Sequence, residues 1–83
     1  MEEILVYILF SEKYQKKYIG VTSNLIARFK SHNELGTKGW TKSYRPWIVI
    51  HIEVYFNKKE ALRREKFLKS GKGRQWIKQN LNI

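Results

Sequence analysis

The feature that most constrains the fold of this chain is an uninterrupted apolar run at residues 4–10 (ILVYILF). The run is rich in β-branched and aromatic residues and is too short for a helix, so it predicts a β-strand. Since the run contains no charged or strongly polar residue, both faces of this strand must be covered. We therefore expect the central strand of a sheet that lies between layers of other elements.

Two further strands are predicted beside it. Residues 17–21 (KYIGV) follow a short polar segment and are expected to pair with the first strand as a hairpin. Strand geometry then places Tyr7 on one face with Leu5 and Leu9, and Tyr18 on one face with Gly20. Residues 47–56 alternate as a third strand. One of its faces is expected to carry Ile48, Ile50, Ile52, Val54 and Phe56, and the other Trp47, Val49, His51, Glu53 and Tyr55.

A helix is predicted after the hairpin. Residues 22–24 (TSN) are three candidate N-caps for a helix that runs to about residue 33 and ends before Gly36. The apolar stripe of this helix is expected to consist of Leu25, Ile26 and Phe29. Residues 36–46 contain two glycines and a proline and should form a basic, aromatic loop.

Two more helices are expected after the third strand. Asn57 can cap a helix that continues to about Ser70, with Gly71 as its terminator, and a short basic amphipathic helix runs from Arg74 to about Leu81. These elements predict an α/β fold of the α+β kind, in which helices flank a small three-stranded sheet. Because 83 residues allow only one core, residues 1–83 are expected to form a single domain.

The charge of the chain predicts a polyanionic partner. The formal net charge is +10, and residues 58–83 hold nine Lys and Arg against two Glu, whereas residues 1–15 hold one Lys against three Glu. Apolar residues interrupt the cations, which favours a folded binding surface over a disordered tail. Nucleic acid is therefore favoured as the partner over an anionic membrane.

Composition also excludes several classes of protein. The chain has no Cys, so disulfides, thiolate zinc sites and thiol nucleophiles are excluded. The first residues are acidic where a signal peptide would be basic, and no apolar run approaches the ~18 residues of a membrane span. We expect a cytoplasmic protein without membrane association.

Glu65 is the first residue whose position suggests chemistry. In the predicted helix it falls between Ala61, Leu62 and Leu68, on the stripe expected to face the core. A carboxylate in that position must be paired or must bind a metal. The structural alternative is an ion pair with a neighbouring arginine or with a cation elsewhere in the chain.

Two pairs of residues also suggest a site, beside which we expect Glu65 to lie. Arg28 and His32 lie one helical turn apart, so they can present a phosphate-binding guanidinium and an imidazole to one cleft. Their alternative is a solvated helix edge. Tyr7 and Tyr18 lie on neighbouring strands where their phenol groups can meet, and their alternative is a buried aromatic pair.

In combination these residues resemble the signature of the GIY-YIG nucleases. Residues 18–20 (YIG) read as the second signature, and residues 5–7 (LVY) sit where the first is expected. Arg28 follows Tyr18 by ten residues, His32 follows four residues later, and Glu65 is the helical glutamate. Residues 41–47 (TKSYRPW) and 64–73 (REKFLKSGKG) are similar to the small stand-alone branch of the family and to the nuclease domain of bacterial excision repair.

The resemblance implies a DNA endonuclease that uses one Mg²⁺ or Mn²⁺, with Glu65 as the metal ligand and a three-stranded sheet flanked by helices. It implies that Tyr7 or Tyr18 helps to deprotonate the attacking water, that Arg28 holds the phosphate, and that His32 assists proton transfer or orients the base. A tyrosine with its usual pKa near 10 is a poor base. We therefore expect the pKa of the catalytic tyrosine to be lowered by Arg28 or by metal-bound water.

The chain departs from the family pattern at three positions. Leu5 replaces the glycine of the first signature, and Val21 stands where some members have a lysine. A polar residue late in the family fold has only Asn80 as a candidate here. These departures bear on catalytic efficiency more than on the fold.

Cationic residues spread over the second half of the chain are expected to contact the nucleic acid, namely Lys42, Arg45, Lys69, Lys72, Arg74 and Lys78. The alternative function is a non-catalytic nucleic-acid-binding module, in which Trp40, Tyr44 or Trp47 stacks on bases. RNA is an alternative to DNA, because phosphate contacts do not distinguish the two. A chain this short would need a partner protein or a distorted substrate to select a specific target.

Overall fold

In the computed structural model, which describes residues 2–35 and 39–83, the early apolar run forms the middle of a three-stranded sheet. Strand β1 (Ile4–Ser11) pairs antiparallel with β2 (Lys16–Thr22) on one side and with β3 (Ile48–Tyr55) on the other. The strand order is β2-β1-β3. The predicted hairpin and the predicted central strand are thus both confirmed.

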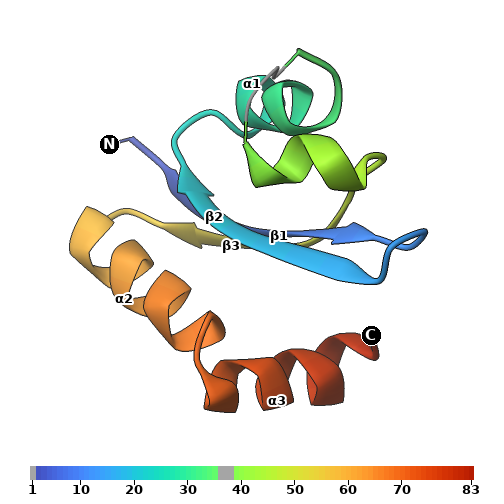
Figure 1. The fold of residues 1–83 in the computed structure, drawn as a ribbon. Coiled ribbons are helices and arrows are strands. Elements are labelled where there is room, and N and C mark those ends of the chain that lie inside the picture. Colours follow the sequence, from blue (N-terminus) through green and yellow to red (C-terminus); the bar gives the residue numbers. More distant parts are fainter. Residues whose placement is uncertain (1, 36–38) are drawn as a thin grey trace.

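Helices cover the two faces of the sheet. Helices α2 (Lys58–Leu68) and α3 (Gly71–Leu81) lie against one face (Figure 1). Helix α1 (Leu25–Lys30), the π-helical turn η1 (Ser31–Leu35) and the 3-10 helix η2 (Trp40–Tyr44) lie against the other. Among the described residues, no helix is long and apolar enough to cross a membrane.

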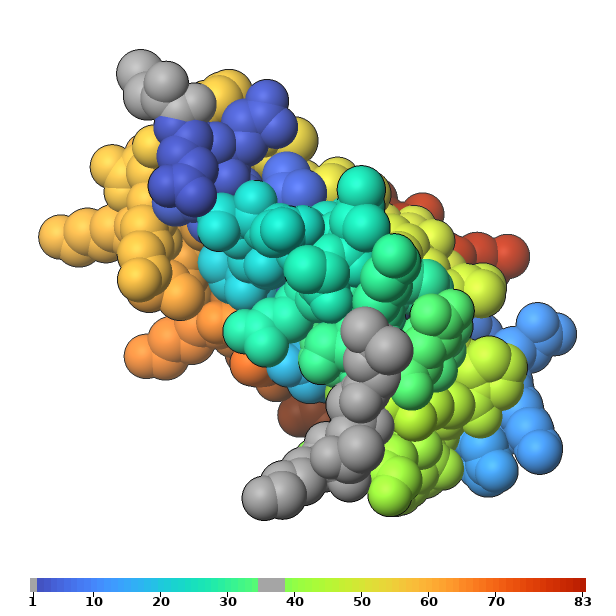
Figure 2. Space-filling model, turned by 90° about the horizontal axis from the view of Figure 1, so that it is seen from above, coloured from blue at the N-terminus to red at the C-terminus, as the bar shows by residue number. Residues whose placement is uncertain are grey.

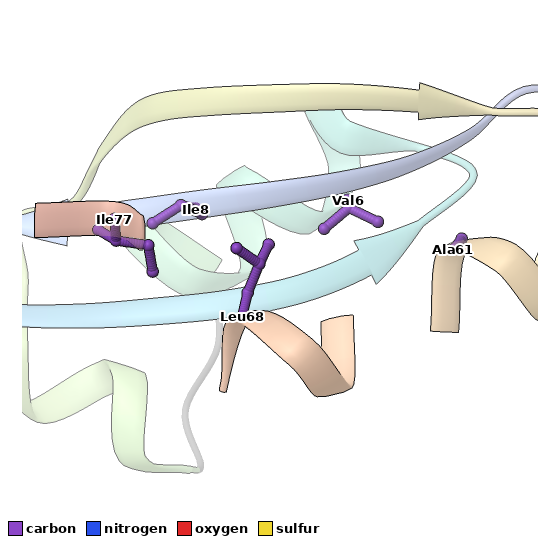
Figure 3. Packing of buried hydrophobic residues seen from close by; sticks show 5 residues of the cluster. All are labelled: Val6, Ile8, Ala61, Leu68 and Ile77. Atoms are coloured by element: carbon purple, nitrogen blue, oxygen red, sulfur yellow. The ribbon is translucent and has the colours of Figure 1, made fainter. Parts of the chain in front are cut away.

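Alternate residues of β1 supply the cores of these two layers. Val6 and Ile8 are fully buried on the side of α2 and α3 (Figure 3), where they form a cluster with Ala61, Leu68 and Ile77. Tyr7 and Leu9 point the other way and form a second buried cluster with Trp47, packed against Tyr18, Leu25, Phe29 and Tyr44. A strand buried on both faces therefore holds two layers together, as the unbroken apolar run predicted.

The register of the hairpin brings the two predicted tyrosines onto one face. Tyr7 is opposite Gly20 and Leu9 is opposite Tyr18. A Cβ atom on Gly20 would lie 2.5 Å from the Tyr7 hydroxyl oxygen and 2.6 Å from Cζ of the same ring. Only glycine at this position leaves room for the Tyr7 ring to lie across β2.

Strand β3 corrects the prediction that one face carries all its isoleucines. His51 pairs with Ile8 and Val49 pairs with Leu9, so the register shifts at Ile50. The extra residue interrupts the alternation, and Ile50 packs on the α2 and α3 side while Ile52 and Val54 share the face of Tyr7. At this edge of the sheet, the exposed fractions of Ile52 and Val54 are 47% and 49%.

The first helix begins where expected but differs in its surface and its end. The Asn24 side chain accepts a hydrogen bond from the backbone N–H of Ala27, at 3.1 Å. Ile26 is 73% exposed, so it does not belong to the buried stripe formed by Leu25 and Phe29. After Lys30 the chain continues in the wider turns of η1.

The predicted loop over residues 36–46 is partly wrong. Residues 36–38 lie outside the described part of the chain, but Trp40–Tyr44 forms the short 3-10 helix η2. Its conformation brings Thr41 into the interior, where the residue is buried. The segment that seemed irregular in sequence is therefore part of the second core layer.

The C-terminal helices begin at side-chain caps. Asn57 caps α2 as predicted, and its side chain accepts from the backbone N–H groups of Lys59 and Glu60. The prediction that Gly71 terminates α2 is wrong, because α2 ends at Leu68 and Gly71 is the first residue of α3. Ser70 provides the cap that starts α3.

Candidate active site

Tyr7, Tyr18 and His32 meet on the α1 side of the sheet. The Tyr7 hydroxyl oxygen lies 3.0 Å from Nε2 of His32, in a buried hydrogen bond. The Tyr18 ring lies beside them, with its centroid 4.5 Å from that of His32 and 6.2 Å from that of Tyr7. The structure therefore brings together three of the five predicted catalytic residues, from β1, β2 and η1.

The segment that follows η1 holds His32 in place. Nδ1 of His32 is 3.0 Å from the Thr41 hydroxyl oxygen. Arg45 donates from Nε to the His32 carbonyl oxygen at 2.7 Å and from Nη2 to the Ser31 carbonyl oxygen at 3.3 Å. The sequence did not predict a role for Thr41. Only its position in the segment 41–47, which is similar to the family, distinguishes it from other threonines.

The predicted contacts of Arg45 differ from those the structure contains. Two donors of its half-buried guanidinium bind backbone carbonyls of η1, so the side chain stabilises the turn that carries His32. Its contact with nucleic acid stays a prediction. The contact between Arg45 and η1 joins residues that are 13 positions apart, and a sequence alone does not reveal it.

The acidity of Tyr7 is opposite to the sequence-based expectation. Burial raises the pKa of Tyr7 well above the ordinary tyrosine value, and the nearby Tyr18 and Glu65 raise it further. The positive charge of Arg28 lowers the pKa but does not outweigh these effects. Arg28 therefore does not give Tyr7 the lowered pKa that was expected, and Tyr7 keeps its proton at neutral pH; a lowering by metal-bound water stays a prediction.

His32 is neutral in the same cluster. Burial lowers the pKa of His32 below its ordinary value of 6.5, and the positive charges of Arg28 and Arg45 lower it further. A neutral imidazole has one nitrogen that donates a hydrogen bond and one that accepts. His32 can therefore accept the hydroxyl proton of Tyr7 at neutral pH.

Arg28 places a positive charge at the mouth of the cluster. Its exposed side chain lines a hollow of about 250 Å³ together with Tyr18, His32, Trp40 and Thr41. Figure 2 views the molecule from this side, with α1 in teal between the blue N-terminal residues and the yellow-green segment of η2. The hollow is open to solvent and combines a cation with polar and aromatic side chains, which suits a phosphate group.

Glu65 lies in the other layer of the fold and acts on the cluster through its charge. It lies on α2 with 22% of its side chain exposed, and its Oε2 is 3.2 Å from Nζ of Lys69 one turn further on. Its charge contributes to the raised pKa of Tyr7, so the two side chains interact electrostatically. The structural alternative is therefore met in part: Glu65 has an ion pair, but its partner is the exposed Lys69 and not a neighbouring arginine.

A second part-buried acid, Glu53, has several partners. Its carboxylate accepts hydrogen bonds from Arg64 at 2.9 Å, from the Tyr55 hydroxyl at 2.8 Å and lies 2.8 Å from Nε2 of His51. Burial would raise the pKa of Glu53, but the hydrogen bonds from Arg64, His51 and Tyr55 hold it below the usual range. This network lies on the α2 and α3 face, so His51 does not belong to the candidate site.

Cationic side chains line a groove beside Tyr18. The groove has a volume of about 530 Å³, and its lining includes Lys16, Lys17, Trp40, Lys69 and Arg74. Lys69 and Arg74 were predicted to bind nucleic acid, whereas Lys16 and Lys17, which directly precede Tyr18, were not among the predicted residues. Lys42, Lys72 and Lys78 are exposed outside this lining.

Comparison with known proteins agrees with this arrangement. The GIY-YIG catalytic domain matches residues 3–80. A UPF0213 protein of Staphylococcus haemolyticus is 35% identical over 78 residues, which cover 94% of each chain. A UPF0213 protein of Clostridium perfringens is 38% identical over 64 residues, covering 77% of this chain and 68% of that protein.

A solved structure has the same fold. The solution NMR structure of a UPF0213 protein of Bacillus halodurans matches with a TM-score of 0.57 and 26% identity, over 95% of this chain and 86% of the other. The predicted α+β architecture is thereby confirmed. With the family match spanning residues 3–80 and the signature residues gathered on one face of the sheet, this chain belongs to the GIY-YIG family.

Proposed function

We propose that this chain is a divalent-metal-dependent endonuclease that hydrolyses phosphodiester bonds in DNA. The observation that carries the proposal is the 3.0 Å hydrogen bond between the Tyr7 hydroxyl and Nε2 of His32, beside the cationic hollow lined by Arg28. Hydrolysis needs a group that removes a proton from water and a cation that stabilises the phosphate. Both are available on this face.

Tyr7 and His32 act as a proton relay in this proposal. Because the pKa of Tyr7 is raised, its phenol is not a ready-made base. Its oxygen takes a proton from the attacking water while its own proton passes to Nε2 of neutral His32. The water oxygen then forms a bond to phosphorus as the bond from phosphorus to the leaving oxygen breaks. Tyr18 stays the alternative tyrosine, because its ring also contacts His32.

In this proposal, Arg28 and a metal ion held by Glu65 would neutralise the negative charge of the phosphate. Arg28 binds a phosphate oxygen in the hollow and stabilises the negative charge that develops there. Among the described residues, no three His, Asp or Glu side chains form a metal cluster. A lone, partly exposed carboxylate such as Glu65 fits Mg²⁺ or Mn²⁺, which keep most of their water ligands. When bound, the ion would neutralise charge on the phosphate and the leaving oxygen.

The cationic groove beside Tyr18 supports nucleic acid as the substrate. Lys17 and Arg74 line it from β2 and α3, so they can neutralise phosphates on either side of the cut. We propose that the substrate is DNA in preference to RNA. We also propose that the whole chain is one nuclease domain, because Val6 and Ile77, from opposite ends of the sequence, share one core cluster. A cytoplasmic location stays a prediction.

Plasmid cleavage tests the proposal. Pure protein is incubated with supercoiled plasmid in Mg²⁺, in Mn²⁺ and in EDTA, and nicked and linear products are measured. Tyr7→Phe should lose on the order of 10²-fold or more of the cleavage rate, as expected for an acid–base group. Tyr14→Phe, the same change in the hairpin turn, should cut as the wild type does. Wild-type cleavage by Tyr7→Phe would refute the relay.

The same assay separates the second candidate function. A tyrosine serves most readily as a base when its pKa is lowered. The raised pKa of Tyr7 therefore favours the second candidate, a non-catalytic nucleic-acid-binding module. Such a module would bind the plasmid in a gel-shift assay and leave it supercoiled with either metal. Loss of cleavage in EDTA, with binding retained, would instead support the metal-dependent enzyme.

A further inference from the structure

We propose that Thr41 is a positioning residue that selects the tautomer of His32 with its proton on Nδ1. The Thr41 hydroxyl oxygen lies 3.0 Å from Nδ1 of His32, while the Tyr7 hydroxyl lies 3.0 Å from Nε2. With the proton on Nδ1, the lone pair of Nε2 faces Tyr7. The inference rests on the proposed function for its meaning, because only this tautomer can receive the proton of Tyr7.

The two hydroxyl groups differ in a way that favours this tautomer. Both can donate or accept a hydrogen bond. A phenol is intrinsically more acidic than an aliphatic alcohol, and burial disfavours ionisation of both hydroxyl groups, so Tyr7 remains the better donor and Thr41 the better acceptor. The preferred arrangement has Tyr7 donating to Nε2 and Nδ1 donating to Thr41. The reverse arrangement would use the weaker donor and the weaker acceptor.

Thr41 can exert this influence because it is itself fixed. Its residue is buried, and its carbonyl oxygen accepts a hydrogen bond of 2.8 Å from Nε1 of Trp47, whose exposed fraction is 1%. The backbone N–H of Trp47 donates to the Asn33 side-chain oxygen at 2.7 Å. Thr41 and the turn that carries His32 are therefore both tied to the buried residue Trp47, which directly precedes β3.

The charges around His32 keep the ring neutral, which is the condition for a tautomer to matter. Arg28 on α1 and Arg45 after η2 both disfavour the imidazolium, and the rings of Tyr7 and Tyr18 face it from β1 and β2. An imidazolium would carry protons on both nitrogens and could not accept from Tyr7. Arg28 and Arg45 thus keep the His32 ring neutral, and the Thr41 hydroxyl selects which nitrogen of the ring carries the proton.

Nitrogen-15 NMR of the histidine side chains tests the inference without any measurement of cleavage. The chain contains two histidines, so His51 on the opposite face is an internal reference in the same spectrum. We expect His32 in the wild type and in Thr41→Ser to carry its proton on Nδ1. In Thr41→Val, which keeps the shape and removes the acceptor, the population should shift toward the form with its proton on Nε2.

Kinetics provide the second readout. Thr41→Val should lower kcat by about tenfold or more with little change in KM, and Thr41→Ser should restore most of it. A wild-type His32 with its proton on Nε2, or a Thr41→Val variant with unchanged tautomer, overturns the inference. If Thr41→Val does not fold, the wild-type spectrum still decides. Absence of cleavage by a wild type that has the expected tautomer would count against the proposed nuclease and not against the role of Thr41.

Discussion

The phenol ring of Tyr7 occupies the space that a Cβ atom on Gly20 would need, because the two residues are cross-strand partners in the β1–β2 hairpin. This contact explains why a tyrosine of the first signature and a glycine of the second depend on each other. The ring can cross β2 toward His32 only where the strand has no side chain.

Replacement of Gly20 by alanine should therefore damage the site and the fold together. The new Cβ would lie 2.5 Å from the Tyr7 oxygen, so the ring must move and the hydrogen bond to His32 should be lost. Overpacking of this kind costs roughly 1–3 kcal/mol. Thermal melts and plasmid cleavage would measure both effects. Gly71→Ala is the matched control, since no atom lies within 4 Å of the Cβ built there, and it should melt and cut normally.

The same substitution at two glutamates should have opposite consequences. Glu65→Gln removes a partly exposed pair with Lys69, so the free energy of unfolding should change by less than about 1 kcal/mol while metal-dependent cleavage is lost. Glu53→Gln breaks the network with Arg64, His51 and Tyr55 and should destabilise the fold by roughly 2–3 kcal/mol.

Denaturant unfolding and plasmid cleavage on the same preparations would test this pair of predictions. A Glu65→Gln protein that is strongly destabilised and still cuts in Mg²⁺ would contradict the metal-ligand role. An unaltered stability of Glu53→Gln would show instead that the part-buried network contributes little.

His32 should make the stability of the fold depend on pH. Its pKa is 6.5 in the unfolded chain and lower in the folded protein, so the unfolded state binds more protons in between. The stabilisation is complete above about pH 6.5 and is lost as the pH falls through the lowered folded pKa. Melting temperatures measured between about pH 5 and pH 7.5 should fall on acidification, and the slope should be smaller in His32→Gln. Equal slopes in the two proteins would contradict burial of a neutral His32.

Salt should weaken nucleic-acid binding through the groove residues. Lys17→Ala and Arg74→Ala should each lower the slope of log affinity against log salt by up to about 1, because each removes one phosphate contact. Lys72→Ala, in the first turn of α3, is predicted from the charge pattern to act in the same way. Lys13→Ala in the hairpin turn is the control, and fluorescence anisotropy at several salt concentrations is the measurement. Slopes that match the control would place the groove outside the interface.

The elements and the five catalytic candidates could be predicted because they depend on local pattern and family spacing. The unbroken apolar run of β1 requires other elements to cover both of its faces, and the Asn57 side chain is a typical N-cap that indicates the start of a helix. The bulge at Ile50 could not be predicted, since an extra residue in a strand is visible only from the register of its partner. Likewise Gly71 was interpreted as a stop, although Ser70 beside it starts the next helix.

The support of the site was hidden from sequence for a related reason. Thr41 and Arg45 act on His32 and its turn through contacts between segments that fold back on each other, and their residue types are as common on surfaces as in sites. Glu53 was assigned to a strand face from the alternation, but its partner Arg64 lies 11 residues away on α2. A sequence pattern therefore indicates candidate reacting groups more readily than the groups that position them.

The position of β3 at the edge of the sheet has a consequence for the self-association of the protein. Residues Ile48–Tyr55 include no lysine, arginine or proline, the residues that usually block pairing between the edge strands of separate molecules. Mutual repulsion between molecules of net charge +10 opposes such pairing, over a range of about 10 Å at 0.1 M salt. A polyanion that neutralises this charge removes the repulsion. Pairing through β3 is therefore most favoured between molecules that are bound close together on one nucleic acid.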